Sequence, residues 1–350
     1  MARPGSTPAA SADPARQLLE CDEVRVHILV DNTSDILSTG PRSMTPHVSN
    51  LVRRRPGLRL SGNCLCCANW GLALAIDITR GGQTRRLLFD AGPDRPTLKR
   101  NAAHLGYDLT GLDAVVLSHG HWDHAGGLVE PFVQHNRARG TEGAPEFHAN
   151  RGMFVRRGMR LPGGDVIPFR DPPSPDRLRE LGARLHLDDQ ARLLAGGVAY
   201  LSGEVPRVTP YEVGLPGHVA QTRAGAEWRD DPLILDERWL AVHLRGKGIV
   251  VFSACSHAGI VNVLRHARAA FEDAPLYAVM GGLHLSGALN EKIIPETVRD
   301  MAAFRLERIL PGHCTGWRAL NALSQAFGET VTPIAVGQTH DFEGMREELQ

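Results

Sequence analysis

Several features that would assign a chain to a specialised class are missing from this sequence. Its 350 residues contain no run of about 18 apolar residues, which a membrane span requires. Residues 1–20 have no apolar segment of the kind found in secretory signal peptides, so we expect a cytoplasmic protein. These residues are rich in alanine, proline and serine instead, which predicts a disordered N-terminal tail.

Net charge is also lacking. Lysine plus arginine and aspartate plus glutamate each number 39, so the two signs balance. Nucleic acids and anionic membranes attract proteins with a strong positive field, and we therefore expect neither as a partner. The expected partner is a small-molecule substrate. The sequence does not decide between a monomer and a homo-oligomer.

Aromatic residues and cysteines are scarce. Aromatic residues make up 5% of a chain that has 37 glycines, which favours a loop-rich α/β enzyme over a β-sandwich. Three of the six cysteines stand together at Cys64, Cys66 and Cys67, without the paired Cys-x-x-Cys spacing of structural zinc sites. Reduced, buried cysteines beside an active site explain them better than a separate metal cluster.

The sequence does contain one dense group of histidines, His-Gly-His-Trp-Asp-His at residues 119–124. The short, β-branched run at 112–117 comes directly before it and predicts a buried strand. Residues two apart in an extended chain point to the same side, so His119 and His121 can bind one ion together.

Asp123 and His124 stand where a helix should begin, and they can face a second ion. Neutral imidazole and carboxylate are ligands that suit zinc, with iron and manganese as alternatives. The group therefore predicts two divalent metal ions.

More histidines follow the later strands. Predicted strands at 249–253, 276–280 and 308–311 lead to His257, His284 and His313. Successive strand–helix units place such strand ends along one edge of a sheet, where the active sites of α/β proteins lie. His257 or His284 alone would more often be a satisfied polar group than a functional one. Their shared position favours a functional role.

Six segments occur in an order that resembles the metallo-β-lactamase superfamily. They are Leu88-Phe-Asp-Ala-Gly92, Ser118–Gly127, Ser202-Gly-Glu-Val-Pro-Arg207, Cys255-Ser-His-Ala-Gly-Ile-Val-Asn262, Gly281-Gly-Leu-His-Leu285 and Gly312-His-Cys-Thr-Gly316. The series covers about residues 22–340. It is similar to a branch of dihydropterin/ribofuranosylaminobenzene-phosphate synthase-like metal-dependent hydrolases. We do not infer the substrate of this chain from the activity in that name.

The resemblance implies an α/β fold, the αββα sandwich of the metallo-β-lactamase type. We expect it to form a single domain at residues 21–350, with loop insertions at about 33–60, 150–190 and 213–232.

The resemblance also implies roles for individual residues. His313 corresponds to the final histidine ligand of the superfamily. Asp90 corresponds to an aspartate that orients a ligand by hydrogen bonds, although an ordinary turn aspartate explains it nearly as well. Cys255 stands where the superfamily has an aspartate that bridges the two ions. Either its thiolate or His257 is then expected to take that role.

The remaining ligand, a histidine between these motifs, has no clear match. Glu204 and His148 are the candidates for its position. His284 is expected to contact the substrate in a catalytic role beside Asp123, and Thr315, like Asp90 and Glu204, to support the ligands or contact the substrate.

This set of residues implies a dinuclear metal-dependent hydrolase. A metal-bound hydroxide, oriented by Asp123, would attack a small ester, lactone or phosphate-type substrate. The alternatives are an iron-dependent redox enzyme of the same fold and a pterin-linked transferase or synthase. A non-catalytic binder that retains the fold is disfavoured by the nearly complete ligand set.

Overall fold

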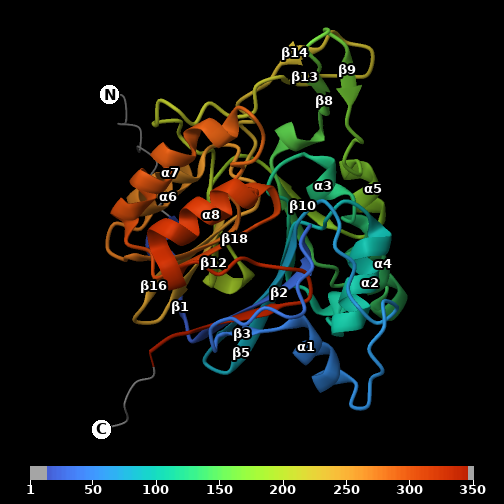
Figure 1. Ribbon diagram of the computed structural model, residues 1–350. Helices are drawn as coiled ribbons and strands as arrows, with labels where there is room; N and C mark the ends of the chain where they lie inside the picture. The colour runs from blue at the N-terminus through green and yellow to red at the C-terminus, as the bar shows by residue number, and fades with distance from the viewer. Residues whose placement is uncertain (1–13, 346–350) are drawn as a thin grey trace, which may run out of the picture.

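Two β-sheets face each other at the centre of the molecule, and helices cover their outer faces. The computed structural model describes residues 14–345. In Figure 1, α6, α7 and α8 (orange and red) lie on one side, and α2, α4 and α5 (teal and green) on the other. The predicted αββα sandwich is confirmed. The helices are α1 (His47–Arg54), α2 (Arg95–Leu105), α3 (Trp122–Ala125), α4 (Val129–Arg139), α5 (Pro175–Glu180), α6 (Ile260–Ala270), α7 (Ile294–Met301) and α8 (Trp317–Phe327).

The first sheet contains eight strands, and all but one of them lie before residue 188. In spatial order they are β10 (Arg184–Leu187), β7 (Glu146–Ala149), β6 (Ala114–Val116), β5 (Gln83–Phe89), β4 (Ala73–Arg80), β2 (Glu23–Val30), β19 (Thr339–Glu343) and β3 (Met44–Thr45). The exception is β19, which inserts between β2 and β3 and pairs antiparallel with both.

The second sheet belongs mainly to the C-terminal half. In spatial order it contains β11 (Arg192–Leu194), β12 (Ala199–Leu201), β15 (Leu240–Leu244), β16 (Gly248–Ser253), β17 (Leu276–Gly282) and β18 (Arg308–Gly312), and β1 (Glu20–Cys21) pairs with β15. The strands β16, β17 and β18 run parallel and are joined through α6 and α7. Their carboxyl ends therefore meet at one edge of the sheet.

The strand β16 is buried on both faces, which explains why its sequence is an unbroken apolar run. Val250 and Phe252 belong to the core between the two sheets, whereas Ile249 and Val251 pack against the outer helices. A strand that is covered on both faces needs apolar residues at every position. The continuous run predicts this strand correctly but carries no period-two signal.

A third, four-stranded sheet stands at the top of the view in Figure 1. Its order is β14 (Arg229–Asp230), β13 (His218–Gln221), β8 (Arg156–Arg160) and β9 (Val166–Pro168). The sequence predicts irregular insertions at 150–190 and 213–232, so these strands correct that prediction. The sequence of β8, with its arginines and glycine, has no alternation of apolar residues that would predict a strand. The strand forms because β8 hydrogen-bonds to β13, which is distant in sequence.

The other differences concern local structure. The expected loop at 33–60 contains β3 and α1. Residues 1–13 of the predicted tail lie outside the described residues. Residues 14–20, which the prediction included in the tail, instead form a 3-10 helix and the start of β1, with Ala15 and Leu18 buried.

The helix expected to begin at Asp123 and His124 is in fact two helices, α3 and α4, separated at Gly126 and Gly127. Here the chain passes so close to the loop after β5 that an added Cβ would lie 1.7 Å from the Pro93 carbonyl oxygen at Gly126 and 2.2 Å from that of Ala91 at Gly127. Only glycine fits such a close approach. Among residues 14–345, no helix combines the length and the apolar character needed to cross a membrane.

Candidate metal centre

Three histidines form the first group of converging ring nitrogens. His119 Nε2 lies 3.0 Å from His121 Nδ1 and 3.1 Å from His257 Nε2. His119 and His121 follow β6, and His257 follows β16, so two facing sheets supply the group. All three side chains are buried.

The second group adjoins the first. His124 Nε2 lies 3.1 Å from His313 Nε2. Asp123 Oδ2 lies 3.7 Å from His124 Nε2 and 3.5 Å from His313 Nε2. The rings of His119 and His124 have centroids 4.3 Å apart, so the two groups are in contact.

Cys255 lies between the two groups. Its Sγ atom is within 4.8 Å of the ligand atoms of His119 and His257 on one side, and of His124 and His313 on the other. The position that the sequence assigns to a bridging ligand is therefore the position of this sulfur, and His257 lies in the first group instead.

The electrostatics of the histidines suit metal ligation. Burial, followed by repulsion from neighbouring histidines, holds the pKa of His119 and His257 well below the usual value, and burial lowers that of His313 to about 3. These imidazoles are neutral, which is the form that binds metals. Burial also lowers the pKa of His124, but Asp123 and Asp90 outweigh that effect and raise it to about 9.

The residues present fit a pair of metal ions. In the first group, neutral imidazole nitrogens face one another at 3.0 and 3.1 Å with too few protons to satisfy every pair, and a cation between them removes the repulsion of their lone pairs. Five histidines, one aspartate and one cysteine form a donor set that suits zinc or another borderline metal.

Buried carboxylates hold the backbone of the site. Asp90 accepts hydrogen bonds from the Ser118 backbone nitrogen and hydroxyl, both at 2.7 Å, and pairs with His124 Nδ1 at 2.6 Å. It is therefore placed to orient His124, as the sequence predicts. Its backbone has a φ of 61°, a left-handed conformation that turns the chain sharply at the end of β5.

Two further carboxylates accept hydrogen bonds from the backbone at the site, and the sequence did not predict either of them. Asp31 accepts from the His313 backbone nitrogen at 2.8 Å, and Glu237 accepts from the backbone nitrogens of His257 and Ala258 at 2.7 and 2.6 Å. Asp31 follows a strand as Asp90 does, and that position could have identified it. Nothing in the local sequence distinguishes Glu237.

Two other predicted residues lie at the strand ends beside the groups. The half-buried His284 ring has its centroid 4.2 Å from that of His257. Thr315 Oγ1 donates to the Gly312 carbonyl at 2.7 Å and accepts from the Leu283 nitrogen at 3.1 Å, so it ties the ends of β17 and β18 together.

The structure does not bring Glu204 or His148 to the centre. Glu204 is exposed and lines a separate cavity of about 460 Å³. His148 bonds to Glu146 at 3.1 Å and stacks on His186 with centroids 4.5 Å apart. The histidine that accompanies His119 and His121 is His257, and neither earlier candidate for that position is needed.

His218 also lies at the site, although no sequence pattern predicts it. This residue begins β13, in a segment expected to be irregular, and its Nε2 lies 3.0 Å from His121 Nε2. No motif surrounds it, and only the pairing of β13 with β8 brings it to the site.

The cysteines at 64–67 form no metal group with other described residues. Cys64 and Cys66 are buried and Cys67 is exposed, and all three are free thiols. Their loop packs on α2, where Asn101 accepts from the Cys67 backbone nitrogen at 2.8 Å. They are thus separate from the histidine groups, and the expectation that all three are buried is wrong for Cys67.

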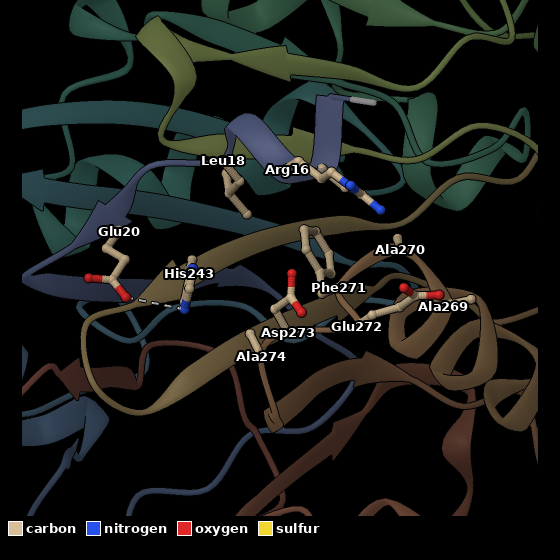
Figure 2. Close-up of a pocket in the computed structure, with 11 residues that line it drawn as sticks. Arg16, Leu18, Glu20, His243, Ala269, Ala270, Phe271, Glu272, Asp273 and Ala274 are labelled. Atoms are coloured by element: carbon tan, nitrogen blue, oxygen red, sulfur yellow. Dashed lines mark ion pairs between the residues drawn. The ribbon is translucent and has the colours of Figure 1, made fainter. Parts of the chain in front are cut away.

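A separate cavity of about 390 Å³ is lined by residues near the N-terminal end of β1, by His243 and by the residues at the end of α6 (Figure 2). His243 and Glu20 form an ion pair on its wall at 3.5 Å. It contains none of the predicted site residues, so the histidine groups remain the candidate for chemistry.

Comparisons with known proteins agree with this site. A family model described as the beta-lactamase superfamily domain matches residues 85–149, which include Asp90 and the histidine motif. A Methanocaldococcus jannaschii protein named 7,8-dihydropterin-6-methyl-4-(beta-D-ribofuranosyl)-aminobenzene-5'-phosphate synthase is 28% identical over 273 residues, which cover 78% of this chain and 90% of that protein. An uncharacterized protein of the same organism is 29% identical over 258 residues, 74% of this chain and 88% of that protein.

Solved structures share the fold. A metal-dependent hydrolase of the beta-lactamase superfamily has a TM-score of 0.65 at 21% identity, covering 91% of this chain and 99% of that one. Unliganded yeast PDE1 has a TM-score of 0.51 at 11% identity, covering 92% of this chain and 100% of that one. The predicted resemblance to this superfamily and the predicted fold are both confirmed.

Proposed function

Because this chain has the metallo-β-lactamase fold of its superfamily, we propose that it is a metal-dependent hydrolase of a small ester, lactone or phosphate-type substrate. The observation that supports this proposal best is the pair of adjoining donor groups with Cys255 between them. A dinuclear site of this kind suits hydrolysis, because one substrate can be held and attacked between two ions.

In this proposal His119, His121 and His257 hold one ion. Asp123, His124 and His313 hold the other, and the Cys255 thiolate is shared. When bound, the ions supply Lewis-acid activation of water and stabilise negative charge that develops on the substrate.

The remaining steps belong to the side chains. Asp123 presents a carboxylate oxygen at the second group, where it can accept a proton from the attacking water. His284 lines a small hollow with Val213, Leu285 and Ile293, and it reaches the site from the side that is not fully buried. The proposal gives His284 the role of a substrate contact beside His257.

Two observations favour a second candidate, in which the same site handles a redox reaction or a pterin-linked transfer. The shared ligand is a sulfur rather than a carboxylate oxygen, and thiolate ligands also suit iron. The Methanocaldococcus jannaschii relative is named a synthase that forms a dihydropterin compound.

Metal analysis of protein purified without added metal separates the two candidates. About two zinc ions per chain would support hydrolysis, and iron would support redox chemistry. A screen of ester, lactone, phosphodiester and pterin substrates then tests activity.

The matched variants are a double substitution, His121→Ala with Asp123→Ala, and the control His104→Ala, a histidine on α2 that belongs to no group of converging donor atoms among the described residues. We expect the double variant to lose metal and activity together and the control to keep both. Full activity in a metal-free double variant would refute the proposal.

A further inference from the structure

His218 lies between the His121 ring and the Asp231 carbonyl group and contacts both through its ring nitrogens. Its Nε2 lies 3.0 Å from His121 Nε2, and its Nδ1 lies 2.7 Å from the Asp231 carbonyl oxygen. The side chain is buried, with no exposed surface. Phe169 packs edge-on against the His121 ring at a centroid distance of 5.5 Å and covers the pair.

The carbonyl oxygen determines which nitrogen carries each proton. A carbonyl oxygen can only accept, so His218 Nδ1 must donate to Asp231. In a neutral imidazole the other nitrogen is then an acceptor, and His218 Nε2 accepts from His121 Nε2–H. This leaves the lone pair of His121 on Nδ1, the nitrogen that lies 3.0 Å from His119 Nε2.

From this geometry we propose that His218 is a positioning residue that fixes the tautomer and ring orientation of His121 as a metal ligand. Metal-bound histidines donate their second ring N–H to a fixed acceptor, and that partner raises the affinity for the metal. The inference rests on the proposed binding of metal by His121.

The third sheet carries this partner to the centre. His218 stands opposite Met159 in the pairing of β13 with β8, and its carbonyl accepts from the Asp231 nitrogen at 2.9 Å. A second contact lies beside the first, because Asp236 accepts from the Gly120 nitrogen at 3.1 Å and pairs with Arg157 of β8. The third sheet therefore contacts the His119–His121 turn directly through His218 and indirectly through Arg157, which pairs with Asp236.

His218 is placed behind His121 rather than among the ligands. It contacts Nε2 of His121, whereas the first donor group lies at Nδ1, on another edge of the same ring. One imidazole cannot direct the same lone pair at both. The part of the chain that the structure describes places His218 in no group of three converging donor atoms.

The test measures zinc affinity by competition with a chromophoric chelator and the visible spectrum of the cobalt-substituted protein. His218→Phe fills the space without an acceptor, and His218→Gln returns an acceptor oxygen to about the position of Nε2. His218→Leu serves as a second acceptor-free variant if the phenylalanine disturbs folding. The control His104→Phe removes a histidine of α2 that belongs to no group of converging donor atoms among the described residues.

We expect His218→Phe and His218→Leu to weaken one of the two zinc-binding steps about 10- to 100-fold and to change the cobalt spectrum, as the loss of a ligand's hydrogen-bond partner does. His218→Gln should return the affinity most of the way to that of the unchanged protein. Wild-type affinity and an unchanged cobalt spectrum in both acceptor-free variants would overturn the inference.

A further variant separates the two ways of failing. If His121→Ala loses zinc while the His218 variants do not, only the role of His218 is wrong. If His121→Ala binds zinc as tightly as the unchanged protein, the proposed metal centre is wrong as well.

Discussion

The Sγ atoms of Cys255 and Cys314 lie 3.2 Å apart at the boundary of the two histidine groups. Burial raises the pKa of the Cys255 thiol well above its usual value. Burial also opposes ionisation of Cys314, but the hydrogen bonds from Cys255 and His284 outweigh it and lower the pKa of that thiol. Cys314 Sγ also donates to the Cys255 carbonyl oxygen at 3.4 Å, whereas the Cys255 sulfur lies among the ligand atoms of both histidine groups.

Replacing Cys255 should therefore affect both ions. We expect Cys255→Ala to weaken zinc binding by more than the about 10- to 100-fold that loss of an outer partner costs, because a shared ligand itself is removed. Cys255→Asp should restore much of the affinity. Equilibrium dialysis with metal analysis measures this, with the exposed Cys67→Ala as the control. Tight binding of both ions by Cys255→Ala would contradict a shared thiolate.

Asp90→Asn tests the support of His124. The substitution keeps the shape of the side chain but removes the charge that pairs with His124 Nδ1. We expect the second ion to bind about 10- to 100-fold more weakly and the first to be affected less, because Asp90 reaches His119 only through the Ser118 hydroxyl. Zinc titration would show this as the loss of one tight step. The exposed Asp165→Asn should change neither step, and equal weakening of both steps by Asp90→Asn would argue against this assignment.

Metal removal should lower thermal stability. A ligand at about 1,000 times its Kd stabilises a protein by about 4 kcal/mol, which for a chain of this length corresponds to a fall in Tm of about 5 °C on removal. Differential scanning calorimetry before and after dialysis against a chelator, and after zinc is returned, provides the measurement. The variant with His121→Ala and Asp123→Ala should show no such response. An unchanged Tm after proven metal loss would count against the buried site.

The core between the sheets should be sensitive to truncation. Phe252 of β16 is fully buried there, so Phe252→Ala is expected to lower the free energy of unfolding by about 3–5 kcal/mol. Leu289 is 53% exposed, and Leu289→Ala should have an effect within about 0.5 kcal/mol. Urea unfolding of the metal-free protein compares the two, and a similar cost for both would disagree with the described core.

His340 should contribute to acid sensitivity. Burial lowers its pKa from 6.5 to about 3 in the folded protein. Below pH 6.5 the unfolded chain binds a proton at this position that the folded chain does not, so the free energy of unfolding falls as the pH falls toward 3. His340→Gln should remove about 2 kcal/mol of the loss that occurs between pH 7 and pH 5. Urea unfolding at both pH values would detect it, and parallel losses in the two proteins would refute it.

The sequence predicts much of the fold because its strands are marked by apolar runs and its site residues by motifs at strand ends. His119, His121, Asp123, His124 and His313 meet as the motifs suggest. Adjacent parallel strands bring His257, His284 and His313 to one edge of the second sheet. The residues after β6 belong to the other sheet, so only the resemblance to the superfamily implied that the two sets meet.

What the sequence hides depends on contacts between distant segments. His218 stands in a segment without periodicity, and its role follows from a strand pairing that spans about 60 residues. Glu237 acts through backbone nitrogens of the loop after β16, which leave no trace in residue type. Glu204 and His148, in contrast, were candidate ligands because of their side-chain chemistry, but both lie outside the two histidine groups.

The position of β19 between β2 and β3 bears on how the chain is made. During synthesis the first seven strands of that sheet leave the ribosome long before the strand that joins two of them, so β2 keeps an unpaired edge meanwhile. Until β19 is made, the backbone N–H and C=O groups along this edge of β2 have no strand partner in the sheet.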